Sequence, residues 1–248
     1  MSLLAVEGLA KRFGGVAAVD GVAFALAEGE SLALIGPNGA GKTTLFDAIG
    51  GWLRPDAGSV RLDGREITGL PPRRIWRLGV GRTFQITATF ASMTLAENVQ
   101  MALIAHHRRA FALAPRARRL YRAEAEALLD TVGLAARADA AAAVLPYGDL
   151  KRLELAIALA HGPRLLLMDE PTAGMAGAER ADLMRLVSTL RAERGVAVLF
   201  TEHAMDTVFA HAGRVLVLDR GRLIAEGPPE AIRADPTVRA VYLGESHA

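Results

Sequence analysis

The sequence predicts an α/β fold with a mainly parallel sheet, an N-terminal antiparallel β subdomain and a helical insert. Three observations indicate this arrangement. β-like runs separated by glycines fill residues 3–35, helix-forming residues dominate 95–143, and short apolar runs alternate with helical segments after that. Alternating strands and helices are typical of parallel sheets. The chain has 248 residues, which suits one compact domain with attached subdomains.

Composition excludes several classes of protein. Hydrophobic residues make up 51% of the chain and charged residues 23%, as in globular rather than disordered proteins. The net charge of +2 is too small to indicate nucleic-acid binding. Because there is no cysteine, disulfides and cysteine-ligated metals are excluded. The same absence suits a reducing compartment, and we expect the cytoplasm. The start lacks a signal-peptide pattern and no apolar run approaches the ~20 residues of a membrane span, so any membrane role would need a partner.

The first part of the chain predicts four short strands. They are Leu3–Val6, Val16–Val19, Val22–Leu26 and Leu32–Ile35. Phe13 stands between Arg12 and Gly14, where the pattern predicts a polar turn. An exposed aromatic ring there could stack on adenine, and a contact with the core is an equally good interpretation.

A phosphate-binding loop follows the fourth strand. Its residues read GPNGAGKTT, which fits the pattern Gly, four residues, Gly, Lys, then Ser or Thr. They are Gly36, Pro37, Asn38, Gly39, Ala40, Gly41, Lys42, Thr43 and Thr44. Glycines let backbone NH groups surround the phosphates of ATP, Lys42 can reach the outer phosphates, and the Thr43 hydroxyl can bind Mg²⁺. A chance match in a turn is the alternative, but an apolar strand before the loop and a helix after it favour the nucleotide site.

Residues 54–85 predict further short elements. Ser59–Leu62 followed by Asp63 and Gly64 indicates a hairpin, and two prolines precede a helix over Arg73–Leu78. The next run, Val80–Gln85, ends on a glutamine, a residue type that is mostly solvated and carries little signal alone.

The helical insert is strongly basic on one part of its surface. No acidic residue stands between Glu97 and Glu124. The arginines there are Arg108, Arg109, Arg116, Arg118, Arg119 and Arg122. One interpretation is a solvated helical face, and the other is contact with anionic lipid headgroups, at about 1 kcal/mol per basic residue. An apolar face is expected from the spacing of Tyr121, Ala125, Leu128, Leu129 and Val132.

The second half of the chain predicts parallel strands that end in polar residues. The first strand is Leu165–Met168, and Asp169 and Glu170 follow it. A helix over Glu179–Arg194 leads to the second strand, Val196–Phe200, and His203 comes shortly after that strand. Ligands of parallel sheets bind at the carboxyl ends of the strands. We therefore expect Gly36, Asp169 and His203 to converge. A hairpin from Arg214 and a short helical tail to about Leu243 follow.

The converging side chains suit ATP hydrolysis. Asp169 could bind Mg²⁺, Glu170 could act as general base towards the attacking water, and His203 could hydrogen-bond near the γ-phosphate. A structural turn is the alternative for the two acids, but it leaves the independent phosphate-binding loop unexplained.

These motifs resemble those of the ATP-binding cassette (ABC) family over essentially the whole chain. They are the loop at Gly36–Thr44, Gln85, LPYGD at Leu145–Asp149, LLLMDE at Leu165–Glu170, and His203. The resemblance implies a P-loop NTPase core in one domain over 1–248, with the core at about 1–85 and 162–248 and a helical subdomain at 86–161. It also implies roles for single residues: Gln85 senses Mg²⁺ and water, His203 is the switch histidine, and Phe13 stacks on adenine.

Two loops depart from the family pattern. The signature loop, commonly LSGGQ, here contains Pro146, Tyr147, Gly148 and Asp149, so the serine contact to the γ-phosphate is absent. The helix that begins near Gly148 still offers NH groups and a positive dipole end to a phosphate on an opposing subunit. The segment Ala173–Ala176 departs from SALD, and Ala176 cannot supply the aspartate.

Within the family, three features resemble the ATPases of branched-chain amino acid importers. They are GRTFQ at Gly81–Gln85, the YG-type signature, and the ending DPTVRAVYLGE at Asp235–Glu245. The resemblance implies a second cassette, identical or related, that closes head to tail over two ATP molecules. It implies permease subunits contacting Ile86–Thr94, an extracytoplasmic substrate-binding protein that acts indirectly, and a place at the cytoplasmic face of the membrane.

Two other functions remain open from the sequence. One is a cassette that energises lipid or polysaccharide export. The other is a soluble ATPase acting on nucleic acid or ribosomes through the arginine-rich insert. We do not expect such a partner because the chain has one cassette, lacks a long coiled-coil insert, and has a tail that resembles importer subunits.

Overall fold

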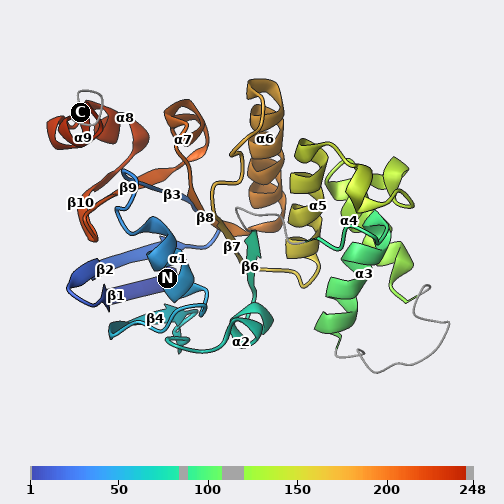
Figure 1. The fold of residues 1–248 in the computed structure, drawn as a ribbon, viewed down its shortest axis with the longest axis horizontal. Coiled ribbons are helices and arrows are strands. Elements are labelled where there is room, and N and C mark those ends of the chain that lie inside the picture. Colours follow the sequence, from blue (N-terminus) through green and yellow to red (C-terminus); the bar gives the residue numbers. More distant parts are fainter. Residues whose placement is uncertain (1, 84–88, 108–119, 244–248) are drawn as a thin grey trace.

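The computed structural model describes residues 2–83, 89–107 and 120–243 of the chain. It forms two sheets with helices around them (Figure 1). Gln85, residues 86–88 of the segment Ile86–Thr94, and five of the six arginines named above lie outside the described residues; those five are Arg108, Arg109, Arg116, Arg118 and Arg119.

A four-stranded antiparallel sheet is built mainly from the first part of the chain. Its order is β2-β1-β4-β5. The strands are β1 (Ser2–Phe13), β2 (Val16–Ala27), β4 (Ala57–Leu62) and β5 (Arg65–Glu66). The hairpin after Ser59 is confirmed. Two details were wrong: Val16–Val19 and Val22–Leu26 belong to one strand that continues through Gly21, and Phe13 ends β1 instead of lying in the turn.

A six-stranded sheet forms the centre of the molecule. Its order is β10-β9-β3-β8-β7-β6, with every neighbouring pair parallel except β10 and β9. The strands are β3 (Ser31–Ile35), β6 (Val80–Thr83), β7 (Leu165–Met168), β8 (Ala197–Thr201), β9 (Arg214–Asp219) and β10 (Arg222–Gly227). Predicted parallel pairing of the two strands before and after Glu179–Arg194 is confirmed. The motifs that follow β3, β7 and β8 therefore share one edge.

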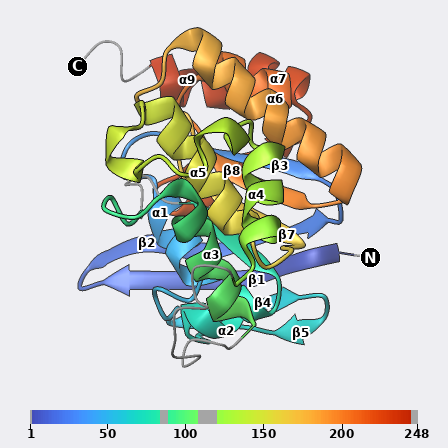
Figure 2. The ribbon, with the colours of Figure 1, turned by 90° about the vertical axis from the view of Figure 1, so that its right-hand side faces the viewer.

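Helices cover one face of the large sheet, and α1 with the small sheet covers the other (Figure 2). Alternate residues of β3 show this division, because Ala33 and Ile35 pack in one buried cluster and Leu32 and Leu34 in the other. The helices are α1 (Lys42–Ile49), α2 (Pro72–Arg77), α3 (Leu95–His106), α4 (Arg122–Thr131), α5 (Tyr147–Leu159), α6 (Gly177–Arg194), α7 (Met205–His211), α8 (Pro229–Ala234) and α9 (Pro236–Leu243). None of the helices described is both long and apolar enough to traverse a bilayer.

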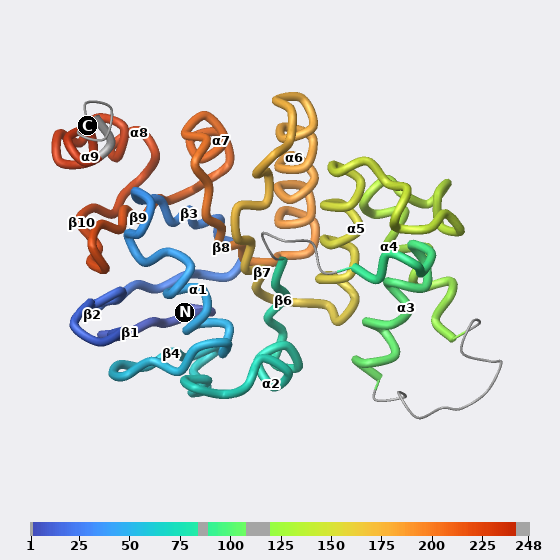
Figure 3. The backbone as a smooth tube through the Cα atoms, viewed as in Figure 1, coloured from blue at the N-terminus to red at the C-terminus, as the bar shows by residue number. Residues whose placement is uncertain are grey.

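Helices α3, α4 and α5 lie together at the end of the molecule opposite α8 and α9 (Figure 3). A capping box fixes the start of α3, since Thr94 accepts a hydrogen bond from the NH of Glu97 and the Glu97 carboxylate accepts one from the NH of Thr94. Ala125, Leu129 and Val132 are fully buried, as the predicted apolar face requires. Arg122 pairs with Glu126 and Asp139, so this arginine belongs to a solvated salt-bridge network.

The helical tail that the sequence predicts to about Leu243 consists of two short helices, α8 and α9. Pro236 prevents α8 from continuing, because it lacks an NH and restricts the residue before it. Asp235 then caps α9: its Oδ1 accepts hydrogen bonds from the NH groups of Thr237, at 2.7 Å, and Val238, at 3.1 Å.

Candidate active site

The phosphate-binding loop joins β3 to α1 and is held between the two sheets. A Cβ at Gly36 would lie 2.1 Å from the carbonyl oxygen of Leu218 in β9, and one at Gly41 would lie 2.0 Å from that of Ala18 in β2. Gly41 also has a φ of +105°, which side chains other than hydrogen strongly disfavour. Glycine is therefore required at both positions.

The loop forms one wall of a cavity of about 210 Å³. The cavity is lined by Ala18, Asn38, Gly39, Ala40, Gly41, Lys42, Thr43, Thr44 and Glu170. Backbone NH groups at the start of α1 carry a partial positive charge that suits phosphate. The predicted loop residues from Asn38 to Thr44 are thus brought together with Glu170.

Lys42 is held inside this loop. Its side chain is buried, and its Nζ donates hydrogen bonds to the carbonyl oxygens of Gly36, at 2.6 Å, and Pro37, at 3.1 Å. The ammonium group is therefore positioned within the loop that would surround a phosphate chain.

The two acids after β7 are oriented by Thr201 at the end of β8. The Thr201 hydroxyl donates to Asp169 Oδ1 at 2.8 Å and accepts from the backbone NH of Glu170 at 2.9 Å. Glu170 has a φ of +45°, a conformation that is uncommon for a residue with a side chain. Thr201 thus fixes the Asp169 carboxylate and the backbone of Glu170 relative to each other.

Asp169 is a buried carboxylate with an altered pKa. Burial raises its pKa above the usual value, while the Thr201 hydroxyl and the Arg82 guanidinium, 3.8 Å away, oppose that shift. Arg82 also binds Asp47 of α1 at 2.7 Å. A bound cation would stabilise the ionised form of this buried carboxylate.

Glu170 and His203 are in contact. Glu170 Oε1 lies 2.8 Å from His203 Nε2, and the two residues come from the ends of β7 and β8. The Glu170 side chain is 19% exposed and that of His203 is 47% exposed, so both are reachable from solvent. The predicted convergence of Asp169 and His203 at one sheet edge is consistent with this contact.

The donors available for a metal fit Mg²⁺ better than a transition metal. No group of three or more His, Cys, Asp or Glu side chains arranged for a metal occurs among the described residues. Thr43 lines the cavity, and the Asp169 carboxylate, which is not part of the lining, directly precedes Glu170, which is. Mg²⁺ is commonly held by one or two such oxygens together with phosphate and water.

Several predicted residues are not brought to this cavity. Phe13 is 52% exposed at the end of β1 and does not line the cavity. The signature residues lie at the start of α5, also outside its lining: Pro146 precedes the helix, Tyr147 is 43% exposed, and Gly148 is buried. The Tyr147 ring lies 3.4 Å from the Cβ position of Gly174, so this loop contacts the segment 173–176.

Three residues that contribute to the site were missed by sequence reasoning. Thr201 orients both acids, Arg82 contacts Asp169, and Ala18 lines the cavity. Only Thr201 had a sequence signal, as a hydroxyl residue that directly follows an apolar strand.

Two family models match the chain. The model for ABC transporters matches residues 19–173, which contain the phosphate-binding loop, the signature loop and both acids. A model described as the branched-chain amino acid ATP-binding cassette transporter matches residues 222–248, which contain β10, α8 and α9.

Curated relatives match along nearly the whole length. The chain is 42% identical to the high-affinity branched-chain amino acid transport ATP-binding protein BraF of Pseudomonas aeruginosa, over 98% of each chain. It is 39% identical to LivG, which has the same description, of Escherichia coli, again over 98% of each. It is 37% identical to the lipopolysaccharide export system ATP-binding protein LptB of Acidithiobacillus ferridurans, over 98% of this chain and 97% of the relative.

Solved structures show the same fold. A nucleotide-free ATP-binding cassette from an ABC transporter superposes with a TM-score of 0.87 at 31% identity, over 98% of this chain and 99% of the other. A dimeric cassette bound to ADP and phosphate in a post-hydrolysis state superposes with a TM-score of 0.78 at 26% identity, over 91% and 98%. By sequence, fold and nucleotide-binding loop, the chain belongs to the ATP-binding cassette transporter family.

Proposed function

We propose that the chain is the ATP-hydrolysing subunit of a membrane importer for branched-chain or other hydrophobic amino acids. The observation that carries this proposal is the branched-chain family model over residues 222–248, outside the general cassette model. BraF and LivG, at 42% and 39% identity, support the same substrate class.

The roles of the site residues follow from their positions. Asn38–Thr44 and Lys42 would bind the phosphates of ATP, and Thr43 and Asp169 would hold a Mg²⁺ ion that neutralises phosphate charge. Glu170 lines the same cavity and would accept a proton from the attacking water, while His203, at 2.8 Å, would keep its carboxylate in place. Two roles stay predictions: that of Gln85 in sensing Mg²⁺ and water, and that of Phe13 in stacking on adenine.

The signature loop would act on the ATP of a second cassette. Tyr147 is exposed, and the loop lies outside the cavity of its own chain. A helix N-terminus supplied by a partner would stabilise the charge of the transferring phosphoryl group. The dimeric relative bound to ADP and phosphate supports this arrangement.

An apolar groove supports attachment to permease subunits. It has a volume of about 330 Å³ and is lined by residues of α2, β6, α3, α5 and β7 together with Gly50 and Trp52. Trp52 is 59% exposed, which is unusual for so large an apolar side chain. We propose that this groove, between the core and the helical subdomain at 86–161, binds a cytoplasmic segment of a permease and so holds the chain at the membrane.

The test is to isolate the chain, tagged, from its native host in mild detergent and to identify what copurifies. We expect permease subunits, and vesicles containing the complex should take up leucine, isoleucine or valine when ATP is enclosed. A complex that moves lipopolysaccharide, as the 37% identity to LptB allows, would refute the substrate class but not the ATPase. Copurification with ribosomes or nucleic acid alone would refute the transport role.

A further inference from the structure

A second cavity, of about 560 Å³, adjoins the phosphate-binding loop. It shares Asn38, Gly39 and Ala40 with the phosphate cavity, but its lining contains neither Lys42, Thr43, Thr44 nor Glu170. Its other walls are Pro37, Asp219 at the end of β9, the turn residue Arg220, and Thr237, Ala240 and Val241 of α9. A volume of this size lies in the usual range for small-molecule sites. The nucleotide site leaves this cavity unexplained.

Helix α9 presents a fixed face to the cavity. Thr237, Ala240 and Val241 have the spacing i, i+3, i+4 and so lie on one side of the helix. Val238 is only 6% exposed and packs in the core, and Asp235 caps the first turn. The helix is therefore anchored behind the cavity wall, within the segment that the branched-chain family model matches.

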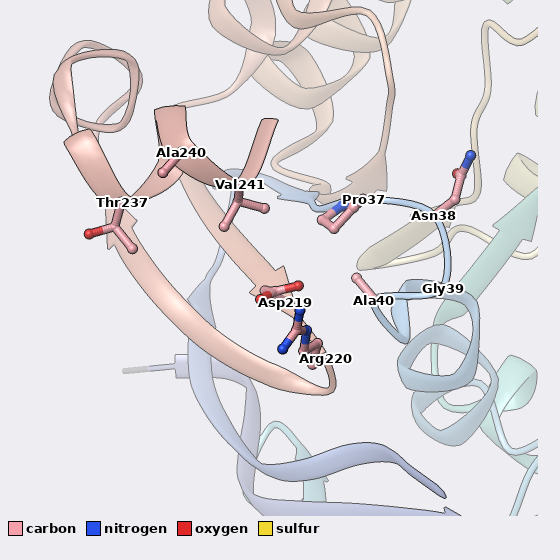
Figure 4. Close-up of a pocket in the computed structure, with 9 residues that line it drawn as sticks. All are labelled: Pro37, Asn38, Gly39, Ala40, Asp219, Arg220, Thr237, Ala240 and Val241. Carbon is pink, nitrogen blue, oxygen red and sulfur yellow. The ribbon is translucent and has the colours of Figure 1, made fainter. Parts of the chain in front are cut away.

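The lining combines both charges with an apolar wall. Asp219 and Arg220 lie side by side between α9 and the loop, and Val241 and Pro37 lie on opposite sides of the space (Figure 4). Within the described part of the chain neither Asp219 nor Arg220 forms a side-chain ion pair, whereas Arg222, in the same hairpin, binds Asp20 at 2.6 Å. A carboxylate and a guanidinium are thus available to a ligand.

We propose that this cavity binds a free α-amino acid with an aliphatic side chain. The ligand ammonium would contact Asp219, its carboxylate would contact the Arg220 guanidinium, and its side chain would pack against Val241, Ala240 and Pro37. The lining chemistry alone selects this class of ligand. Its identification with the transported amino acid rests on the proposed function.

Occupancy of the cavity lowers the affinity of the chain for ATP. The carbonyl oxygen of Pro37 accepts a hydrogen bond from Lys42 Nζ at 3.1 Å. A ligand packed on Pro37 therefore stabilises the loop conformation in which the Lys42 ammonium binds the carbonyl oxygens of Gly36 and Pro37. ATP competes for the same ammonium group. By linkage, ATP weakens amino-acid binding by the same factor. An importer with this site is slowed by its own accumulated product.

The experiment is calorimetric titration of the full-length, nucleotide-free chain with L-leucine. Three probes each lack one feature: 4-methylpentanoate lacks the ammonium, 3-methylbutylamine lacks the carboxylate, and glycine lacks the side chain. We expect each to bind at least about tenfold more weakly than leucine, the loss typical of a missing charged hydrogen bond or buried aliphatic group. Saturating leucine should also raise the Kd for a fluorescent ATP analogue.

Variants locate the site. Arg220→Gln and Val241→Asp should each weaken leucine binding at least about tenfold, and Arg239→Gln, on another face of α9, should leave it within about twofold. Ala240→Asp replaces Val241→Asp if the latter lowers the unfolding midpoint.

The failures of the site and of the import function can be told apart. Absence of leucine binding, or binding that is unchanged in Arg220→Gln, would overturn the site even if the purified complex imports leucine. Leucine binding at this site in a complex that moves another cargo would support the site and overturn its link to the cargo.

Discussion

Glu170 is the residue on which hydrolysis should depend most. Glu170→Gln keeps the size of the side chain near His203 but removes the general base. We expect steady-state phosphate release to fall by about 10²- to 10⁴-fold with ATP binding retained. Glu193→Gln, at an exposed position of α6, should hydrolyse ATP at the wild-type rate. Undiminished hydrolysis by Glu170→Gln would show that another group activates the water.

Asp169 should lower the stability of the chain in the absence of a cation. Its pKa is raised in the folded chain, mainly by burial. Its contribution to stability is therefore present at acidic pH and is lost as pH rises through the folded pKa. We expect Asp169→Asn to raise the unfolding midpoint at pH 7, and the difference to shrink on acidification. Differential scanning calorimetry of both chains without Mg²⁺ measures this, and a lower midpoint at pH 7 would contradict it.

At the residue level, sequence motifs predicted the groups that carry chemistry but not those that orient them. Asp169, Glu170 and His203 were found because each follows an apolar strand. Thr201 was missed as an orienting residue, because its importance depends on β8 lying beside β7, a pairing that brings its hydroxyl to the Asp169 carboxylate and the backbone NH of Glu170. Arg82 was missed because its contact with Asp169 depends on the pairing of β6 with β7.

The loop between β3 and α1 should tolerate no side chain at Gly41. Gly41→Ala places a Cβ 2.0 Å from the Ala18 carbonyl oxygen and should abolish nucleotide binding while lowering the unfolding midpoint. Gly14→Ala is the matched control, since Gly14 also has a positive φ, +57°, but open space around its Cβ. The control should lose only about 1–2 kcal/mol of folding stability, the cost of placing a residue with a Cβ in the left-handed conformation. Nucleotide titration and thermal unfolding of both variants distinguish the two costs.

At the element level, strands and helices were predicted well where hydrophobic pattern alone decides them. The errors occurred at glycine and proline. Gly21 was interpreted as a strand end, yet β2 continues through it because pairing with β1 holds both sides. The predicted helical tail was given without the boundary at Pro236 that divides it into α8 and α9.

For the whole molecule, the groove around Trp52 should decide assembly with the permease. Trp52→Glu puts a charge into an apolar contact and should reduce copurification of permease subunits at least about tenfold. ATP hydrolysis by the isolated chain should be unchanged. Val144→Glu, at a position that is 73% exposed and outside the groove, is the control and should assemble normally. Normal assembly of Trp52→Glu would refute the groove as the docking surface.

The two carbonyl groups that leave no room for a Cβ at Gly36 and Gly41 belong to different sheets. Leu218 is in the six-stranded sheet and Ala18 in the four-stranded sheet. The loop therefore fits only one distance between the sheets. A change in that distance would bring a carbonyl group into contact with Gly36 or Gly41, or would leave a gap beside one of them. A loop transplanted from a relative would function only if that relative spaces its sheets alike. Inheritance of the nucleotide site is thus inheritance of the whole sheet-to-sheet arrangement.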